Sequence, residues 1–371
     1  MGLLPLAVLF LIRLSGGIEF QSVAVATPML VAHGLSYADA GALLGAFVLP
    51  GIVVTVPAGM LAQRFGDRWV LAGGLLLMAL GGGLLSVAPN FPAMLLARVL
   101  SGIGGVAVVM LTIKMTADRY ARSTALAVVI TAWPAGMAVG LLVLGPLPVL
   151  LGWRATLAFG SLPALCALPL VAVLASVRSH DAAPGTTHAT APKLGFIALA
   201  ASAWSLLNAA LAVMAGFLPA YLISVGDAPK IAGAKASIAI WSAAAIPLGG
   251  VLADLFIGRT PAVVGGTLLT AAMFCITPAV GGAIPALLAL GTAFAIAPAP
   301  LTAQVGQATP AGARAIVFGW YSGAAFLGMT VAPWLAGIMR DVTGHPAAPL
   351  LFAAALMLGV LPLYAAFLRA R

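Results

Sequence analysis

The sequence predicts an all-α membrane protein in which twelve transmembrane helices form two pseudo-symmetric six-helix bundles. Of the 371 residues, 63% are hydrophobic and 7% are charged, whereas soluble domains average roughly 45–50% and 25%. The apolar residues form continuous runs of about 20, long enough to cross the hydrocarbon core of a bilayer as helices. Such runs exclude a β-barrel, because barrel strands alternate apolar and polar residues.

An internal repeat predicts that the two bundles are similar. A short charged turn at residues 59–68 returns at residues 250–259, about half of the chain length later. The matching positions are Gly59, Leu61, Ala62 and Arg68 in the first copy and Gly250, Leu252, Ala253 and Arg259 in the second. A second set of matches joins Trp133, Gly136 and Pro146 to Trp320, Gly323 and Pro333. Two sets of matches at nearly the same offset indicate two equivalent halves.

Breaks between the apolar runs place the individual spans. We expect the twelve spans at 4–31, 38–62, 69–87, 91–113, 124–150, 154–176, 194–224, 231–254, 260–280, 282–304, 313–339 and 347–369. Ser36 and Asp39 resemble a capping box that begins the second span. The one long polar stretch has the composition of a linker. We therefore expect an N-terminal bundle at 1–176, a cytoplasmic linker at 177–193 and a C-terminal bundle at 194–371.

The basic residues of the loops predict how the spans are oriented. One set of loops, together with the C-terminus, carries most of the arginine and lysine residues, whereas the opposite loops carry only Arg154, Lys230, Lys235 and Arg340. Because basic loops stay in the cytoplasm, we expect a multi-pass protein of the cell (inner) membrane with both termini cytoplasmic. This distribution also accounts for the net charge of +9, so we expect no nucleic-acid partner.

The halves and their repeated turn resemble the major facilitator superfamily of secondary transporters. Each turn is similar to the superfamily motif G-x-L-A-D-R-x-G-x-R, between the second and third spans of each half. Further similarities are residues 98–105 in the fourth span, Gly145-Pro146 in the fifth, and Gly152-Trp153-Arg154 at the sixth. The resemblance covers the whole chain and implies the major facilitator fold, alternating access and a small-molecule substrate.

Three shorter segments look like the cyanate and nitrate/nitrite porter-like branch of this superfamily. They are residues 19–23, 111–118 and 133–136. Proteins of this branch carry diverse small solutes, so the resemblance implies a class of substrate and fixes no single one.

The two turns are the expected gate on the cytoplasmic side. The resemblance gives this role to Gly59, Gln63, Arg64, Gly66, Asp67 and Arg68 in the first copy and to Gly250, Asp254 and Arg259 in the second. We expect their charges to hold helix ends and the opposite bundle together when the site faces outward. Both copies depart from the motif: Gln63 replaces an aspartate, Leu255 replaces a common basic residue, and Gly258 is displaced by one position. These departures predict a weakened gate.

Three ionisable residues within spans are the first candidates for function, because a charge inside a bilayer is costly. Arg13 lies about 14 Å into the first span at 1.5 Å per residue, and its guanidinium suits a carboxylate, nitrate-like or phosphate-like anion. A salt bridge between helices, or snorkelling, is the alternative. Glu19 is either a proton carrier or a structural partner of Arg98. Arg98 matches a fourth-span arginine that the resemblance links to proton-coupled transport, and otherwise it pairs with a carboxylate or snorkels.

Neutral polar and aromatic residues of other spans complete the predicted binding site. The full set is Arg13, Gln21, Trp133, Asn208, Tyr221 and Gln304. A buried amide needs a hydrogen-bond partner, so Asn208 and Gln304 either line a cavity or form a plain hydrogen bond between helices.

The sequence therefore predicts a secondary active transporter, and no enzyme. It contains no ATP-binding motif, hydrolytic triad or cluster of metal ligands, so we expect neither a cofactor nor a metal. We expect a monomer in a lipid bilayer that moves a small anionic solute, with protons as a candidate coupling ion. The first alternative is a proton-driven exporter of amphiphilic drugs, which an apolar cavity and 13 methionines would suit. The second is a non-transporting receptor or scaffold with the same fold.

Overall fold

The computed structural model describes residues 3–120, 123–176, 194–309 and 314–370, and this part of the chain forms helices and no strands. Eleven helices are long and apolar enough to cross a membrane, and there are twelve such spans when one bent pair counts as a single span. The bent pair is Tyr37–Ile52 and Pro57–Phe65, which meet at 60°. The expected twelve-span, all-α architecture is thereby confirmed, while the predicted linker at 177–193 lies outside the described residues.

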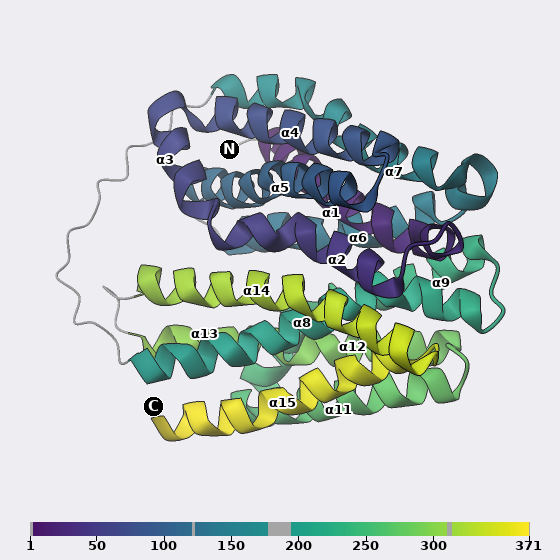
Figure 1. Cartoon of the computed structure of the whole chain (residues 1–371). Coiled ribbons are helices and arrows are strands. Elements are labelled where there is room, and N and C mark those ends of the chain that lie inside the picture. The colour runs from purple at the N-terminus through teal and green to yellow at the C-terminus, as the bar shows by residue number, and fades with distance from the viewer. Residues whose placement is uncertain (1–2, 121–122, 177–193, 310–313, 371) are drawn as a thin grey trace.

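The first six spans form one layer of the molecule, drawn in purple and blue in Figure 1. Its helices are α1 (Leu3–Ala32), α2 (Tyr37–Val48), η1 (Leu49–Ile52), α3 (Thr55–Phe65), α4 (Asp67–Val87), α5 (Phe91–Arg119), α6 (Ser123–Leu144), α7 (Leu147–Ala167) and η2 (Pro169–Ser176). Within this N-terminal layer, α1 packs against α6 and α7, and α4 packs against α5 and α7.

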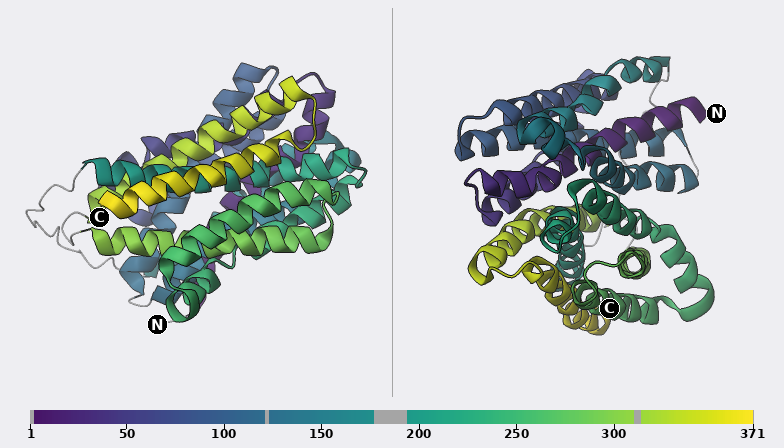
Figure 2. Two further views of the ribbon diagram at one scale, coloured as in Figure 1. Left: turned by 90° about the horizontal axis from the view of Figure 1, so that it is seen from below. Right: turned by 90° about the vertical axis from the view of Figure 1, so that its right-hand side faces the viewer.

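The second six spans form a facing layer, drawn in teal, green and yellow, and the right-hand view of Figure 2 shows one layer above the other. Its helices are α8 (Leu194–Ser224), α9 (Pro229–Ala243), α10 (Ile246–Leu252), the π-helix η3 (Ala253–Ile257), α11 (Arg259–Ala279), α12 (Ile284–Ile296), α13 (Pro298–Ala308), α14 (Arg314–Thr343) and α15 (Ala348–Ala370). Within this C-terminal layer, α8 packs against α14 and α15, and α12 packs against α9 and α11.

The two layers meet mainly through α2 and α14, through α6 and α9, and through α1 and α8. Glycines let these backbones touch. Gly41 of α2 lies directly against the carbonyl of Pro333, and Gly145 at the end of α6 lies against Gly233 of α9. A methyl group on Gly41 would overlap the backbone of α14, so these crossings require the small residue.

Hydrogen bonds also join the layers on the side of the membrane away from the termini, here called the distal side. The Asp341 carboxylate, near the end of α14, accepts from the backbone N–H groups of Tyr37 at 3.0 Å and Ala38 at 2.8 Å. These donors belong to the first turn of α2, where no intrahelical acceptor exists. Ser36 and Asp39 form the predicted capping box at the same helix end.

The side that holds the termini, here called the terminal side, is more open. The elements at this side include α3, α10, η3 and α13, and Figure 1 places α3 and α13 at the end where the C-terminus lies. In the described part of the chain, none of them makes extensive contact with the opposite layer. The structure is thus closed at the distal side and open towards the terminal side.

The two copies of the repeated turn share a glycine with positive φ. Gly66 precedes α4 with φ 89°, and Gly258 precedes α11 with φ 81°; such angles favour glycine because it has no Cβ. The interval from Gly59 to Gly66 is one residue shorter than that from Gly250 to Gly258. The π-helix η3 takes up the extra residue, as a π-bulge does. The displaced glycine therefore still occupies the equivalent place in the turn.

Candidate functional site

A cavity of about 210 Å³ lies between the two layers and is lined by both. Helices α1, α2, α5 and α6 contribute from the N-terminal layer, and α8 and α14 from the C-terminal layer. Most of the lining is apolar or aromatic, and Arg13 is the one ionisable side chain among the described lining residues. Because ligand sites favour the boundary between domains, this cavity is the candidate site.

Arg13 reaches the cavity from α1 and is held by α5. Its side chain is 6% exposed. Nη1 donates to the carbonyl of Val109 at 2.7 Å and contacts the hydroxyl of Thr112 at 3.4 Å. Nε is buried and has no hydrogen-bond partner, and no carboxylate of the described residues lies within 4.0 Å of this guanidinium. The side chain is fixed in place and still has donor capacity for an anion.

Aromatic side chains form opposite walls of the cavity. In the N-terminal layer, Trp133 lies 6.0 Å from Phe20 and 6.1 Å from Phe47 between ring centroids. In the C-terminal layer, Trp204 stacks on Tyr321, with centroids 4.8 Å apart and an interplanar angle of 11°. Flat rings on both sides favour a ligand with an apolar, planar body.

The polar lining from the C-terminal layer includes Asn208 and Ser322. The side-chain nitrogen of Asn208 donates to the carbonyl of Trp204, one turn earlier in α8, at 2.9 Å. Asn208 therefore forms a hydrogen bond within its own helix and lies at the cavity wall.

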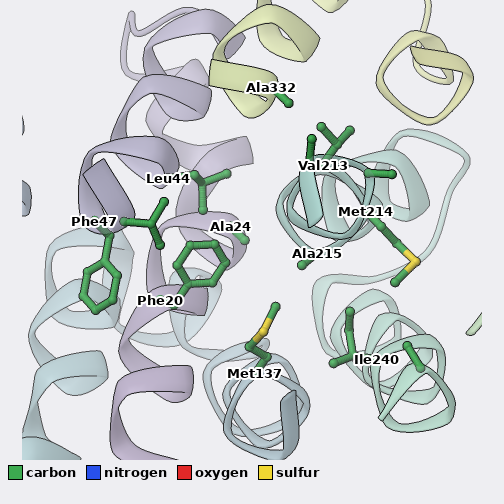
Figure 3. Packing of buried hydrophobic residues seen from close by; sticks show 14 of the residues in the cluster. Phe20, Ala24, Leu44, Phe47, Met137, Val213, Met214, Ala215, Ile240 and Ala332 are labelled. Atoms are coloured by element: carbon green, nitrogen blue, oxygen red, sulfur yellow. The ribbon is translucent and has the colours of Figure 1, made fainter. Parts of the chain in front are cut away.

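Apolar packing between the layers continues beside the cavity. Figure 3 shows Phe20, Ala24 and Leu44 of the N-terminal layer lying across from Ala215 of α8, while Met214 turns towards the rest of its own layer. All of these side chains are buried. These side chains are apolar, and no ion pair of the described residues crosses from one layer to the other, so separation of the layers breaks no such pair.

A second polar cluster lies inside the N-terminal layer, around Glu19. The carboxylate accepts a short hydrogen bond from the hydroxyl of Ser101 on α5. Its other oxygen, Oε2, is buried without a partner. Gly82 of α4 lies beside the same carboxylate, because a Cβ at this position would collide both with Oε1 of Glu19 and with Ser161 of α7. Glu19 is thus 1% exposed and enclosed by three neighbouring helices.

Arg98 shares this cluster but binds backbone carbonyls. Its Nε donates to Leu43 at 3.2 Å, Nη1 to the carbonyl of Glu19 at 3.3 Å and Nη2 to that of Phe20 at 2.9 Å. The guanidinium also lies 4.5 Å from the ring centroid of Phe47, a favourable cation–π distance. Neither a carboxylate ion pair within 4.0 Å nor snorkelling is observed for Arg98, which is 0% exposed. Phe47 also lines the cavity, so this cluster lies one aromatic layer behind the cavity wall.

The structure places three other predicted binding residues away from the cavity. Gln21 is buried between the layers and donates to the carbonyl of Ala215 at 3.1 Å. The Tyr221 hydroxyl donates to the carbonyl of Pro278 at 3.2 Å. Gln304 is hydrogen-bonded to Tyr364 within the C-terminal layer at 2.7 Å. Of the six predicted binding residues, Arg13, Trp133 and Asn208 come together at the cavity.

The repeated turns are stabilised within their own layers. Asp67 pairs with Lys114 of α5 at 2.6 Å, and Asp254 pairs with Arg259 at 2.7 Å. No ion pair of the described residues joins the two turns to one another, and Arg64 and Arg68 have no carboxylate partner within 4.0 Å. The expected contact between bundles is therefore absent in this state, in which the terminal side is open.

Sequence reasoning missed Lys114, Ser101 and Phe47 as members of these sites. Lys114 and Ser101 fall within segments singled out for their motifs, but only the packing of α5 against α1 and α4 shows which side chains they reach. Phe47 lies in a continuous apolar run, and no feature of the sequence distinguishes it from its neighbours. In the described residues, no group of three or more His, Cys, Asp or Glu side chains could hold a metal ion.

Two similar layers around a shared cavity, with a buried arginine on its wall, define the architecture of a secondary membrane transporter. The chain belongs to the Major Facilitator Superfamily, whose family model matches residues 8–239. This agrees with the resemblance expected from the repeated turns.

Among curated proteins, the chain is similar to a 3-(3-hydroxy-phenyl)propionate transporter of Escherichia coli (strain K12), with 28% identity over 174 residues, covering 46% of this chain and 43% of that protein. It is also similar to the quinolone resistance protein NorA of Staphylococcus aureus (strain N315), with 28% identity over 88 residues, or 23% of each chain. The matches thus span less than half the length of either relative.

Solved structures show the same fold. The crystal structure of a D-xylose-proton symporter superposes with a TM-score of 0.78 over 97% of both chains at 17% identity. A bacterial homologue of the human lysosomal transporter Spinster, in an inward-facing and occupied conformation, superposes with a TM-score of 0.78 over 98% of this chain and 96% of that one at 18% identity. At these identities the similarity concerns the fold.

Proposed function

We propose that the chain is a secondary transporter that moves a small organic carboxylate across the membrane by alternating access. The observation that carries this proposal is Arg13, a buried guanidinium on the cavity wall with an unpartnered Nε. A guanidinium offers several donors in a plane and binds carboxylates through paired hydrogen bonds. Since burying such a charge without a carboxylate partner is costly, a substrate anion gives it a role.

The shape of the cavity supports a substrate with a flat apolar body. Trp133 and Trp204 lie on opposite layers and would enclose a ring, while Arg13 binds the carboxylate. The E. coli relative transports 3-(3-hydroxy-phenyl)propionate, which combines a ring with a carboxylate. A volume of about 210 Å³ favours a small solute, because pockets for drug-sized ligands typically measure about 300–1,000 Å³.

Proton coupling through Glu19 is the second part of the proposal. Its carboxyl group is enclosed by apolar helices and has an oxygen free of hydrogen bonds, so it can bind and release a proton as the layers move. Arg98 positions α1 and α2 around it through their carbonyls. Phe20 and Phe47 connect this cluster to the cavity wall, which gives substrate binding a physical route to Glu19.

The remaining assignments follow from the charge distribution and the repeated turns. We propose that the chain lies in the cell (inner) membrane with both termini cytoplasmic, so that the open terminal side faces the cytoplasm. The turns at 59–68 and 250–259 would close this side when the layers rock together. The chain would act as a monomer, because one copy contains both walls of the cavity.

Two other substrate classes are the alternatives. The resemblance to the cyanate and nitrate/nitrite porter-like branch favours smaller inorganic anions. The similarity to a quinolone resistance protein over 88 residues, together with the mostly apolar lining, favours export of amphiphilic drugs. Uptake of one representative of each class distinguishes the three.

The test is uptake into proteoliposomes that contain the purified chain. Labelled 3-phenylpropionate, nitrate and a fluorescent amphiphile would be offered with and without an imposed pH gradient. We expect uptake of the aryl carboxylate, faster with an inward proton gradient and lost in Arg13→Ala. Transport of nitrate or the amphiphile alone, or carboxylate transport unchanged in Arg13→Ala, contradicts the proposal.

A further inference from the structure

A second cavity lies entirely within the N-terminal layer, between α3, α4 and α5. Its volume is about 840 Å³, and it shares no lining residue with the central cavity. It begins near the break between α2 and α3, where the two segments of the span meet at 60°. Small residues of α4 widen it: a Cβ on Gly73 would meet no atom within 4 Å. We call this cavity the lateral groove.

The lateral groove opens onto the membrane-facing surface of the layer. Three apolar side chains of its lining are largely exposed: Leu61 at 47%, Phe65 at 56% and Trp69 at 64%. In a bilayer these side chains contact lipid, and a hollow among them is filled by an acyl chain because water there would lack polar partners. Trp69 lies near the start of α4, at the interfacial depth that tryptophan prefers.

The charges at the mouth of the lateral groove are positive and unneutralised. Arg64 of α3 lines the groove, and Arg68 lies in the first turn of α4, beyond the break at Gly66. Their guanidinium carbons lie 5.3 Å from the ring centroid of Phe65 and 5.0 Å from that of Trp69, and neither has a carboxylate within 4.0 Å among the described residues. The nearby Asp67 is already paired with Lys114.

We propose that the lateral groove is a binding site for an anionic phospholipid of the leaflet at the terminal side. One acyl chain occupies the hollow between α3 and α4, and the phosphate and anionic headgroup bind Arg64 and Arg68. Basic pockets between membrane helices bind anionic headgroups in this way. The equivalent turn of the C-terminal layer provides a contrast, because Arg259 is neutralised by Asp254 at 2.7 Å.

The experiment measures contact between lipid and Trp69, and is independent of transport. The full-length chain would be reconstituted in phosphatidylcholine vesicles containing a minor fraction of either brominated phosphatidylglycerol or brominated phosphatidylcholine, since bromine on the acyl chain quenches indole fluorescence on contact. The contribution of Trp69 is the difference between the wild-type chain and Trp69→Phe.

We expect Trp69 to be quenched more strongly by brominated phosphatidylglycerol than by the same fraction of brominated phosphatidylcholine. Arg64→Gln and Arg68→Gln should each lower the relative binding constant for the anionic lipid about fivefold, corresponding to one basic residue at the membrane surface. Arg259→Gln is the matched control and should leave it unchanged. Gly73→Leu should reduce the quenching by both lipids, since its side chain fills the groove.

Two results would overturn the proposal. Equal quenching by the two lipids would mean that the groove holds bulk lipid without selectivity. Selectivity that persists in the chain carrying both Arg64→Gln and Arg68→Gln would assign the anionic lipid to another site. Arg64 and Arg68 are exposed, so these variants should fold, and an unchanged thermal midpoint in detergent checks that they do.

Discussion

Each layer contains six spans, but among the described residues buried charge is confined to the N-terminal layer. Its buried ionisable side chains are Arg13, Glu19 and Arg98, whereas the buried polar side chains of the described C-terminal layer are hydroxyls and amides such as Thr270 and Gln304. A charge inside a membrane protein must be offset by specific partners. The two halves therefore share the helical scaffold, while the N-terminal half also contains buried charges and the groups that bind them. In the proposed function, the N-terminal layer would bind the anion and carry the proton, and the C-terminal layer would supply an aromatic wall.

The largest expected effect would come from neutralising Glu19. In Glu19→Gln we expect the pH gradient to stop driving solute accumulation, because an amide cannot exchange a proton but can still accept the hydrogen bond from Ser101. Exchange of labelled for unlabelled solute across the membrane should remain, which shows that the site is intact. If solute accumulation in Glu19→Gln still follows the pH gradient, another residue carries the proton, and the contrast between the layers is weaker.

Loss of Arg98 should cost the most stability. Arg98→Met removes three buried hydrogen bonds to carbonyls, so we expect unfolding free energy to fall by about 3 kcal/mol or more. Gln304→Met is the matched change in the C-terminal layer, and by losing its bonds to Tyr364 it should cost only about 1 kcal/mol. Denaturant titration in detergent compares them, and equal losses would show that buried charge carries no special structural weight here.

Substitutions of Arg13 test the proposed anion site through the KM for the carboxylate. We expect Arg13→Gln to raise the KM for the carboxylate about 10- to 100-fold, since a charge-assisted hydrogen bond contributes about 1.5–3 kcal/mol. The KM of Arg13→Lys should lie between those of the wild-type chain and Arg13→Gln, because a point charge replaces the planar donor pair. Asn208→Ala, on the opposite wall, should change the KM by less. A larger effect at Asn208 than at Arg13 would reverse the assignment of roles to the layers.

The smallest effect concerns the distal contact that joins the layers. Asp341→Ala removes the acceptor for two N–H groups of α2, a capping loss of about 1 kcal/mol, and should raise the fraction of molecules open on that side. Spin labels at His33→Cys and His345→Cys, in a background without Cys166 and Cys275, report the opening as a longer distance. An unchanged distance distribution would show that glycine packing alone keeps the distal side closed.

The sequence predicted the features that depend on local pattern. Runs of apolar residues identify the spans, the repeated turn identifies the halves, and Ser36 with Asp39 identifies a helix start, because each depends on neighbours in the chain. The side-chain partners depend on how each helix is rotated and at what height it meets the next. Periodicity could not show that Arg98 binds carbonyls of α1 and α2, or that Gln304 faces Tyr364 and not the cavity.

The position of Lys114 shows the same limit. In the sequence it is one basic residue among several, yet in the structure it pairs with Asp67 and leaves Arg64 and Arg68 without a carboxylate partner among the described residues. No spacing rule connects residues so far apart in the chain. Such long-range pairing decided which charges of the first turn remain available.

The three carbonyl contacts of Arg98 have a mechanical consequence. One guanidinium on α5 fastens the backbones of both α1 and α2, and it does so next to Phe47 on the cavity wall. These three helices should therefore move as one rigid body, with little sliding between them. A solute that displaces the Phe47 ring would therefore move all three helices together, including their ends at the two membrane surfaces.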